Sequence, residues 1–491
     1  MNQRIRRLSI ALMTLFAILF VQLNIIQVGR KSSLDDDQRN TRQAVRDFNE
    51  PRGDILSADG VVIATSERRD DGSGHPWQRL YPEGELFADV TGYFTFAYGA
   101  TQVEKVANDV LAGRTPQQQI QGIASLFDGA DTTGTVELTI DGEIQQAARA
   151  ALSDREGSVV VVDVQTGAVK AMWSFPTFDP NYVATHDDRE AGDVLEFLND
   201  VPGNPLLANA YQERYMPGST FKVITTAAAL DAGVIDLQST FDEESEFVPP
   251  QTTDPISNYD GKSCGGDLTE VFRRSCNTPF ARISLEMGPE RMVEASRRFG
   301  IGEKIPFDLP RPVASTFGDV GYFEENLPLL AIGGFGQGNT QMVPLHMALI
   351  AASVANQGAM MRPFVIDSTY DHSGRLMKRT SPSIWKQAMT PETASIMSGL
   401  MQEVVRSGTA SCCLKLAGGI DAAAKTGTAQ LNGPDEPERS HAWIIGFAPA
   451  TAPRYAFAVM LKGTTAEISA GTGGTLAGPV AKKVLDVALT R

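Results

Sequence analysis

One uncharged, apolar segment near the start of the chain, residues 8–28, restricts the fold more than any other feature of the sequence. A helix rises about 1.5 Å per residue, so 21 residues are enough to cross a hydrocarbon layer of about 30 Å. The segment exceeds the roughly 7–15 apolar residues of a cleaved signal peptide. No small-x-small cleavage site follows it. We therefore expect an uncleaved transmembrane anchor.

The charges around this segment indicate which way it is inserted. Three arginines precede it, at Arg4, Arg6 and Arg7. By the positive-inside rule these charges hold the N-terminus in the cytoplasm. The sequence thus predicts a cytoplasmic tail over residues 1–7, an anchor over 8–28, and a remainder that lies outside the membrane on the extracytoplasmic side.

Composition excludes several classes of function. The 43 Lys and Arg residues are outnumbered by 59 Asp and Glu residues, and the net charge of −16 repels polyphosphate, so no nucleic-acid partner is expected. The sequence has no HExxH motif and no cysteine pair with zinc spacing, and neither a metal nor another cofactor is implied. Four cysteines, too few for a disulfide framework, leave their pairing open. They are Cys264, Cys276, Cys412 and Cys413.

Local patterns divide the extracytoplasmic part into two domains. Short apolar runs flank a turn within residues 51–64 and predict a hairpin in a small mixed domain, residues 29–154. An Asp start and helical spacing of apolar residues predict a connecting helix over residues 141–152. Two β-branched runs around a turn, within residues 157–173, predict a hairpin that opens a second domain, residues 155–491.

The first chemical signal is a serine followed three residues later by a lysine. Ser219 and Lys222 follow a Pro-Gly break and open an Ala-rich segment, which predicts that both lie on one face of a buried helix. A buried, neutral lysine that folds back to the hydroxyl can act as the base that a serine nucleophile needs. The motif is weak by itself, since Ser383 and Lys386 repeat it in a segment that we interpret as surface or helix-start chemistry.

Two further motifs strengthen the signal from Ser219. A Ser-x-Asn sequence, Ser275 to Asn277, begins 56 residues after Ser219, and a Lys-Thr-Gly sequence, Lys425 to Gly427, begins 206 residues after it. Each occurs once in the chain, and each alone would fit a helix cap or a strand end. The three motifs in this order are typical of the serine acyltransferases that recognise penicillin.

The chain resembles the class B penicillin-binding proteins, and among them the penicillin-binding protein A group, over nearly its whole length. Besides the three motifs, the likeness includes Arg52-Gly53-Asp54-Ile55, Leu138-Thr139-Ile140-Asp141, Pro176-Thr177-Phe178-Asp179-Pro180-Asn181, Gly336-Gln337-Gly338 and His441-Ala442-Trp443. The resemblance implies an α+β fold: a transpeptidase domain with a five-stranded antiparallel sheet and a helical lobe, a mixed α/β N-terminal pedestal, and one transmembrane helix.

The resemblance also implies catalytic roles in a peptidoglycan D,D-transpeptidase. Ser219 would attack the carbonyl of the penultimate D-alanine of a stem peptide and form an acyl-enzyme. Lys222 would be the base for acylation. Ser275 would relay a proton toward the departing amine, and Lys425 would supply positive charge for the substrate carboxylate.

The remaining motif residues are assigned to substrate binding by the same resemblance. Asn277 would bind an amide of the donor peptide, and Thr426 and Thr428 would offer hydroxyls to its carboxylate, with Gly427 between them. The backbone N–H groups of Ser219 and Thr428 would form an oxyanion hole. A β-lactam would copy the substrate carbonyl and trap Ser219.

Other readings of the same residues stay open. A D,D-carboxypeptidase would use the same site with water as the acceptor, and a β-lactam-binding scaffold would keep the site dormant. A β-lactamase would need a water-activating group such as a Glu before a Leu-Asn pair, but Leu195 takes that place before Leu198-Asn199. A β-lactam sensor would need several spans and a cytoplasmic effector. The family likeness further implies a membrane glycan polymerase of the RodA type as partner, in elongation or division.

Overall fold

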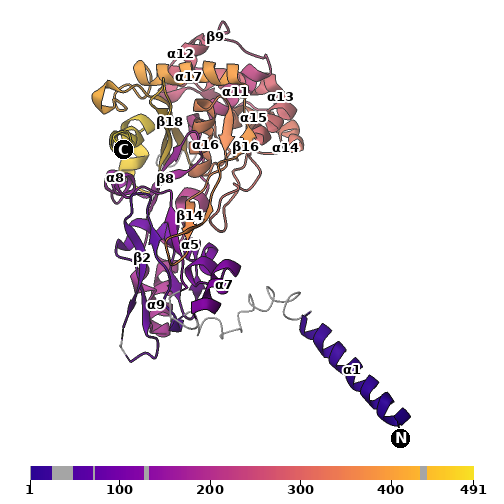
Figure 1. The fold of residues 1–491 in the computed structure, drawn as a ribbon. Coiled ribbons are helices and arrows are strands. Elements are labelled where there is room, and N and C mark those ends of the chain that lie inside the picture. Colours follow the sequence, from indigo (N-terminus) through magenta and orange to yellow (C-terminus); the bar gives the residue numbers. More distant parts are fainter. Residues whose placement is uncertain (1, 25–47, 70–71, 126–131, 432–438) are drawn as a thin grey trace.

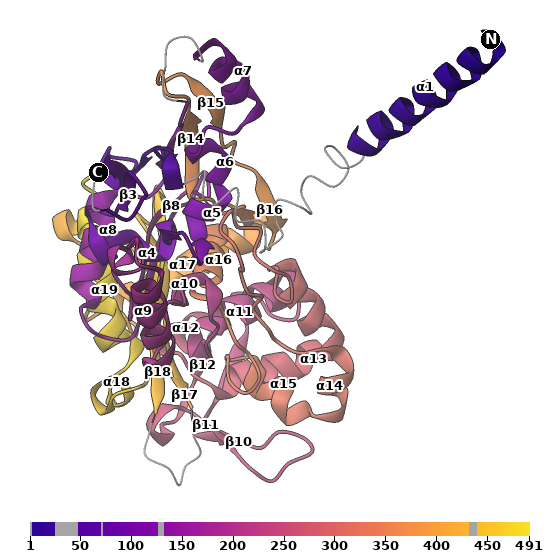
Figure 2. The same cartoon turned by 90° about the horizontal axis from the view of Figure 1, so that it is seen from below.

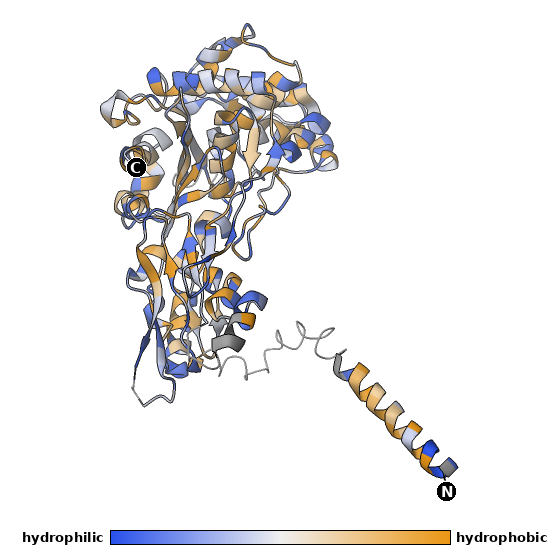
Figure 3. Cartoon of the chain, in the orientation of Figure 1, coloured by the Kyte–Doolittle hydropathy of each residue, from blue (hydrophilic) through white to orange (hydrophobic). Residues whose placement is uncertain are grey.

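The computed structural model describes residues 2–24, 48–69, 72–125, 132–431 and 439–491 (Figure 1). Its first helix, α1 (Asn2–Asn24), is apolar over most of its length, with polar residues near its start (Figure 3). Within it, Gln3–Gln22 is long and apolar enough to cross a membrane. Residues 25–28 of the predicted anchor lie outside the described residues, as does the part of the predicted pedestal before residue 48.

The pedestal is built on a six-stranded sheet whose strands come from two distant parts of the chain. The order is β15-β14-β6-β1-β2-β3. The strands are β1 (Ile55–Leu56), β2 (Val62–Arg68), β3 (Trp77–Leu80), β6 (Thr135–Leu138), β14 (Ile366–Tyr370) and β15 (Leu376–Arg379). The antiparallel pair of β1 and β2 confirms the predicted hairpin, and β6 pairs with β1 in parallel and with β14 antiparallel. The last two strands therefore return from the region that the sequence assigned to the catalytic domain.

Short helices and a small hairpin surround this sheet. They are α4 (Ala88–Thr91), β4 (Phe94–Thr95), β5 (Gly99–Ala100), α5 (Gln102–Val106), α6 (Asn108–Leu111) and α7 (Pro116–Ser125). Among them lies a buried ion cluster: Glu104 accepts hydrogen bonds of 2.6 Å from both Arg52 and Arg79. The Tyr81 hydroxyl also donates to this carboxylate, at 3.2 Å. The Arg52 motif noted in the sequence thus has a structural role in the pedestal.

A capped helix leads from the pedestal to the catalytic sheet. Helix α8 (Gly142–Leu152) begins where Asp141 accepts hydrogen bonds from the backbone N–H groups of Glu143 and Ile144, at 3.1 and 3.2 Å. This N-cap satisfies donors that the first turn leaves unpaired. The predicted connecting helix is confirmed.

The catalytic domain has a five-stranded antiparallel sheet in the order β17-β18-β19-β7-β8. The strands are β7 (Gly157–Asp163), β8 (Val169–Phe175), β17 (Ala423–Gln430), β18 (Ser440–Ala448) and β19 (Tyr455–Leu461). The predicted hairpin of β7 and β8 is confirmed. Every residue of β18 and β19 is buried, because helix α16 (Pro344–Ala355) packs on the sheet while α8 and α19 (Gly478–Ala488) pack on each other and against it.

A helical lobe lies beside the strands β17 and β18 (Figure 2). It contains α11 (Lys222–Asp231), α12 (Leu268–Arg274), α13 (Thr278–Arg298), α14 (Val320–Glu325), α15 (Leu327–Gly333) and α17 (Pro391–Arg406). Preceding α11 is a 3₁₀ turn, η4 (Gly218–Phe221). The other elements are α9 (Asp188–Asp200), α10 (Asn209–Gln212), α18 (Ala466–Ala470), and the strand pairs β9 (Thr240–Glu244) with β12 (Cys264–Asp267), β10 (Glu246–Phe247) with β11 (Ile256–Ser257), and β13 (Ala359–Met361) with β16 (Ile384–Gln387).

The serine of the second Ser-x-x-Lys sequence lies at the surface. Ser383 is exposed and precedes the strand β16, and the Lys386 ammonium forms an ion pair with Glu303 at 2.7 Å. The prediction of a surface position is confirmed, but the expected helix start is wrong because the segment pairs with β13 as a strand.

Candidate active site

Ser219 lies on the 3₁₀ turn η4, directly before the helix that begins at Lys222. The sequence predicted one helix for both residues; the structure has a 3₁₀ turn followed by an α-helix, which keeps them one turn apart. Gly218 adopts φ +54°, and a side-chain carbon there would lie 2.5 Å from the carbonyl oxygen of Thr428. Its N–H donates to the Gly336 carbonyl at 3.0 Å. Glycine at 218 therefore lets the serine turn pack directly against β17.

Lys222 is fully buried, and its ammonium contacts the second motif. Its Nζ donates to the carbonyl oxygens of Ser275 and Cys276, at 2.7 and 2.5 Å, and to Oδ1 of Asn277 at 2.9 Å. Burial lowers the pKa of Lys222 well below its usual range, and the charge of Lys425 lowers it further. Within the described part of the chain, Nζ of Lys222 makes no hydrogen bond with the Ser219 hydroxyl, contrary to the prediction. The carbonyl groups of Ser275 and Cys276 orient Nζ toward the second motif instead.

Ser275 lies between two buried lysines. Its hydroxyl accepts a hydrogen bond of 2.7 Å from Nζ of Lys425 and lies 3.4 Å from Nζ of Lys222. The residue caps α12 in the left-handed region, at φ +63° and ψ +39°, which a serine adopts only where the surroundings hold it. Burial lowers the pKa of Lys425 to about 7. The two lysines and the serine thus form a path along which a proton can move.

Asn277 is held from both sides. Its Nδ2 donates to the Ser257 carbonyl at 3.0 Å, while its Oδ1 accepts from Lys222. Its backbone N–H donates to Oδ1 of Asn258 at 2.7 Å. Both ends of the predicted substrate-binding amide therefore have a partner in the protein, and the side chain remains partly exposed.

The third motif lies on the edge strand β17, which pairs with β18 on one side only. In an antiparallel strand, the N–H and C=O of one residue point to the same side. The Thr428 carbonyl faces Gly218 across the free edge, so the Thr428 N–H points to that edge as well. A side-chain carbon at Gly427 would lie 2.6 Å from the Pro217 carbonyl, so only glycine lets the turn of Ser219 come this close. The strand thus presents a backbone donor toward the serine turn.

Two further residues at this edge were not assigned a role from the sequence. The hydroxyl of Thr409, in the loop after α17, lies 2.5 Å from the hydroxyl of Thr426. Gln337, oriented to suit its partners, bonds both the N–H and the C=O of Gln430, at 3.2 Å each. The Gly-Gln-Gly sequence flagged Gln337 as a family feature, whereas no sequence signal pointed to Thr409.

Two disulfides lie close to these motifs. Cys276, in the middle of the Ser-x-Asn motif, is bonded to Cys264 of β12, and Cys412 is bonded to its neighbour Cys413. The sequence left these pairings open. Cys276 is buried, and it cross-links the second motif to the adjacent strand.

Comparison with known proteins decides the family. Residues 157–486 match the family model for the penicillin binding protein transpeptidase domain. The chain belongs to the penicillin-binding proteins. In this penicillin-binding protein, residues 52–136 match the model for the penicillin binding protein A dimerisation domain.

Relatives of this penicillin-binding protein are similar over its full length. The peptidoglycan D,D-transpeptidase PbpA of Mycolicibacterium smegmatis is 34% identical over 100% of this chain and 99% of its own. PbpA of Mycobacterium tuberculosis is 33% identical over the same shares. The structure of penicillin-binding protein A from M. tuberculosis as a ceftriaxone acyl-enzyme superposes with a TM-score of 0.83 at 32% identity, covering 90% of this chain and 99% of that one. The α+β transpeptidase fold that the sequence predicted is confirmed.

Proposed function

We propose that this penicillin-binding protein is a peptidoglycan D,D-transpeptidase that uses Ser219 as its nucleophile. The observation that carries the proposal is the convergence of Lys222 and Lys425 on the Ser275 hydroxyl, beside the turn that holds Ser219. Burying two lysine side chains in their charged form is costly, and groups with pKa values perturbed in this way concentrate at functional sites. Their position around one serine therefore indicates a role in proton transfer. The M. tuberculosis relative, whose structures are acyl-enzymes with ceftriaxone and penicillin G, supports the same chemistry here.

Acylation begins with Lys222 as the base. In the structure Nζ of Lys222 faces the second motif. Burial favours the neutral amine, which, once turned toward Ser219, accepts the serine proton as the serine oxygen attacks the carbonyl of the penultimate D-alanine. The N–H groups of Ser219 and Thr428 stabilise the oxyanion. The C–N bond then breaks, the terminal D-alanine leaves with a proton delivered through Ser275, and the peptide stays on Ser219 as an ester.

The edge of β17 holds the substrate. The hydroxyls of Thr426 and Thr428 receive the terminal carboxylate beside the charge of Lys425, and Thr409 joins them through its contact with Thr426. Gly427 has no side chain, so the turn of Ser219 can approach the strand closely. The donor peptide can then lie along the strand within reach of Ser219. Asn277 positions Lys222 and presents its amide to the donor peptide.

Deacylation completes the cross-link. An amine from a neighbouring stem peptide attacks the ester, forms the new amide bond and returns the proton through the lysine pair to Ser219. If water takes the place of the amine, the product is a shortened peptide, the outcome of a D,D-carboxypeptidase.

Placement in the cell follows from α1 and from the charges before it. We infer that α1 is a single-pass anchor with a cytoplasmic N-terminus and an extracytoplasmic catalytic domain. We assign residues 29–154 to the pedestal and 155–491 to the catalytic domain, with β14 and β15 completing the pedestal sheet. A transpeptidase makes no glycan, so we also infer a RodA-type membrane polymerase as its partner.

The test is intact-mass analysis of the full-length protein in detergent after incubation with penicillin G. A stable single adduct that is lost in Ser219→Ala and kept in Ser383→Ala supports the proposal. If no adduct forms, the alternative of a scaffold with a dormant site is favoured. If an adduct forms and is lost rapidly, the protein is a β-lactamase. Incubation with stem pentapeptide and an acceptor amine then separates cross-linked from hydrolysed product.

A further inference from the structure

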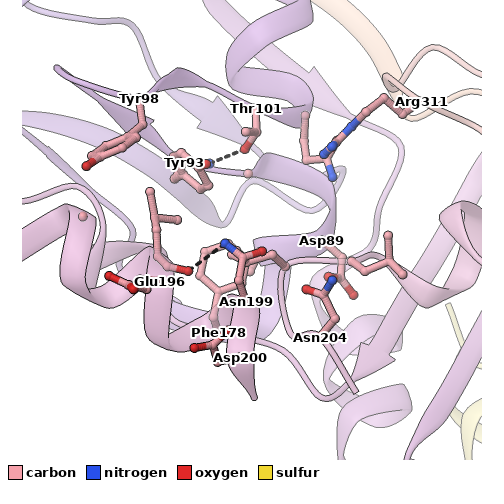
Figure 4. A pocket seen from close by; sticks show the side chains of 17 residues that line it. Asp89, Tyr93, Tyr98, Thr101, Phe178, Glu196, Asn199, Asp200, Asn204 and Arg311 are labelled. Atoms are coloured by element: carbon pink, nitrogen blue, oxygen red, sulfur yellow. Dashed lines mark hydrogen bonds between the residues drawn. The ribbon is translucent and has the colours of Figure 1, made fainter. Parts of the chain in front are cut away.

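A cleft of about 590 Å³ lies between the pedestal and helix α9 (Figure 4). Its walls come from α4, the β4–β5 hairpin and the start of α5 on one side, and from α9 with the turn after it on the other. None of its lining residues belongs to the three catalytic motifs. In Figure 1, α9 lies at the pedestal end of the molecule and α11 at the opposite end. The cleft is therefore distinct from the active site.

Aromatic side chains form one part of the lining. Tyr93 meets Phe178 edge to face, with ring centroids 6.1 Å apart. Tyr98 is 50% exposed, and a side-chain carbon at Gly192 of α9 would lie 2.4 Å from its hydroxyl. Glycine in the middle of a helix is unfavourable relative to alanine, and at 192 it leaves space for the Tyr98 hydroxyl. The Tyr93 ring is thus packed against Phe178, and the Tyr98 ring is half exposed.

Polar groups face these rings from the other side. Glu196, Asn199 and Asp200 project from α9, while Asp89 is buried at the far end and accepts a hydrogen bond of 3.1 Å from the Ser174 N–H (Figure 4). The exposed Arg311 guanidinium reaches over the cleft and makes no hydrogen bond or ion pair with any residue that the structure describes. The cleft therefore offers both hydrogen-bond donors and acceptors beside apolar faces.

The backbone of this cleft is strained at three positions. Gln102, Asn204 and Arg311 have φ values of +44°, +46° and +59°, in the left-handed region that favours glycine. Such residues persist where the surroundings hold them, and they concentrate at functional sites. The Tyr211 hydroxyl fixes the Gln102 side chain at 2.7 Å. Among the described residues, Ser275 in the active site and four non-glycine residues elsewhere share such a backbone: Ser153, Gln251, Asp260 and Gln357.

We propose that this cleft binds N-acetylated sugar residues of the peptidoglycan glycan strand. The C–H faces of a pyranose ring pack on Tyr93 and Tyr98, and its hydroxyls donate to the carboxylates of Glu196 and Asp200. Arg311 donates to the acetamido carbonyl. The exposed carboxylates of Glu196 and Asp200 against one guanidinium disfavour a phosphate or an anionic lipid headgroup. The proposal rests on the proposed function, because the stem peptides that the enzyme joins are attached to this polymer.

The test uses the full-length protein in detergent after its active site has been acylated with penicillin G. Isothermal titration with a neutral tetrasaccharide of N-acetylglucosamine, which carries acetamido groups and no carboxylate, then reports only binding outside the active site. We expect binding to persist, and to weaken at least tenfold in Tyr98→Ala and in Arg311→Gln. Tyr182→Ala is the matched control, since Tyr182 is 68% exposed but does not line this cleft, and it should bind like the native protein.

Three results would overturn the proposal. The acylated protein fails to bind the tetrasaccharide, or both variants bind it as well as the control, or a glucose tetrasaccharide without acetamido groups binds equally well. A lysine-rich peptide that binds in place of the sugar would assign the cleft to a basic protein partner instead. Penicillin acylation, measured by mass in every variant, should be unchanged, so a failure of this proposal is distinct from a failure of the Ser219 assignment.

Discussion

Lys425 donates a hydrogen bond of 2.7 Å to the Ser275 hydroxyl, and this serine lies within 3.4 Å of a second buried lysine, Lys222. Removing the hydroxyl in Ser275→Ala breaks the path between the two amines while leaving both in place. We expect the rate of acylation by penicillin to fall about 100-fold, a common loss when a general acid or base is removed. Stopped-flow acylation measures it, with Ser263→Ala, an exposed serine, as control. An unchanged rate would remove Ser275 from the mechanism.

Burial of Lys425 makes the stability of the fold depend on pH. An unfolded lysine keeps its proton up to about pH 10.4, whereas the buried one releases it near 7. Between these values the unfolded state binds more protons, so the free energy of unfolding rises with pH, by up to about 1.4 kcal/mol per unit from this group. Lys425→Met should lack this rise in urea unfolding at pH 7, 8 and 9. Parallel curves for the two proteins would contradict the assignment.

Gln337 fixes the end of the edge strand through its two bonds to Gln430. In Gln337→Ala the strand loses this brace, and the Thr428 N–H is less well placed for the oxyanion. We expect acylation to slow about tenfold, a loss of about 1.4 kcal/mol in transition-state stabilisation, with little change in the thermal midpoint. The exposed Gln238 provides the control, Gln238→Ala. Equal rates in the two variants would show that the strand end needs no brace.

The disulfide between Cys264 and Cys276 closes a loop of 12 residues around the second motif. Chain-entropy estimates give about 3 kcal/mol for a loop of similar length. We expect the double variant Cys264→Ser, Cys276→Ser to unfold at lower temperature and to acylate more slowly, because the Cys276 carbonyl holds Lys222. The matched variant Cys412→Ser, Cys413→Ser removes a bond between neighbours and should lose less stability. The reverse order in calorimetry would refute this ranking.

Glu104 is the carboxylate partner shared by two buried arginines in the pedestal, Arg52 and Arg79. Glu104→Ala leaves both guanidinium groups buried without their partner, which typically costs 3–5 kcal/mol. Asp109 pairs with Arg114 at 3.5 Å and is 76% exposed, so Asp109→Ala should cost less than about 1 kcal/mol. Chemical denaturation measures both. A loss below 1 kcal/mol in Glu104→Ala would mean that water reaches the cluster.

Short-range patterns were sufficient to predict the parts of the site that lie within a few residues of each other. The cap at Asp141 and the spacing of Ser219 and Lys222 by one turn both follow from local sequence. The prediction that the three motifs form one site rested on their order along the chain, which is typical of the family. No local sequence pattern predicts that they come together.

Other features depend on contacts between distant segments, which periodicity does not encode. Thr409 meets Thr426 only because the loop after α17 folds back on β17. The orientation of Lys222 toward the second motif, instead of toward Ser219, is set by carbonyl groups more than 50 residues away. The bond from Cys276 to Cys264 likewise requires β12 to lie beside the motif.

The pairing of β14 with β6 has a consequence for how the protein is made. Strands β14 and β15, within residues 366–379, complete a sheet whose other four strands end by residue 138. One edge of β6 therefore stays unpaired while more than 200 further residues are synthesised. Recombination that exchanged only the first part of the gene would pair β6 of one parent protein with β14 of the other. The two strands therefore have to be inherited together for their pairing to be kept.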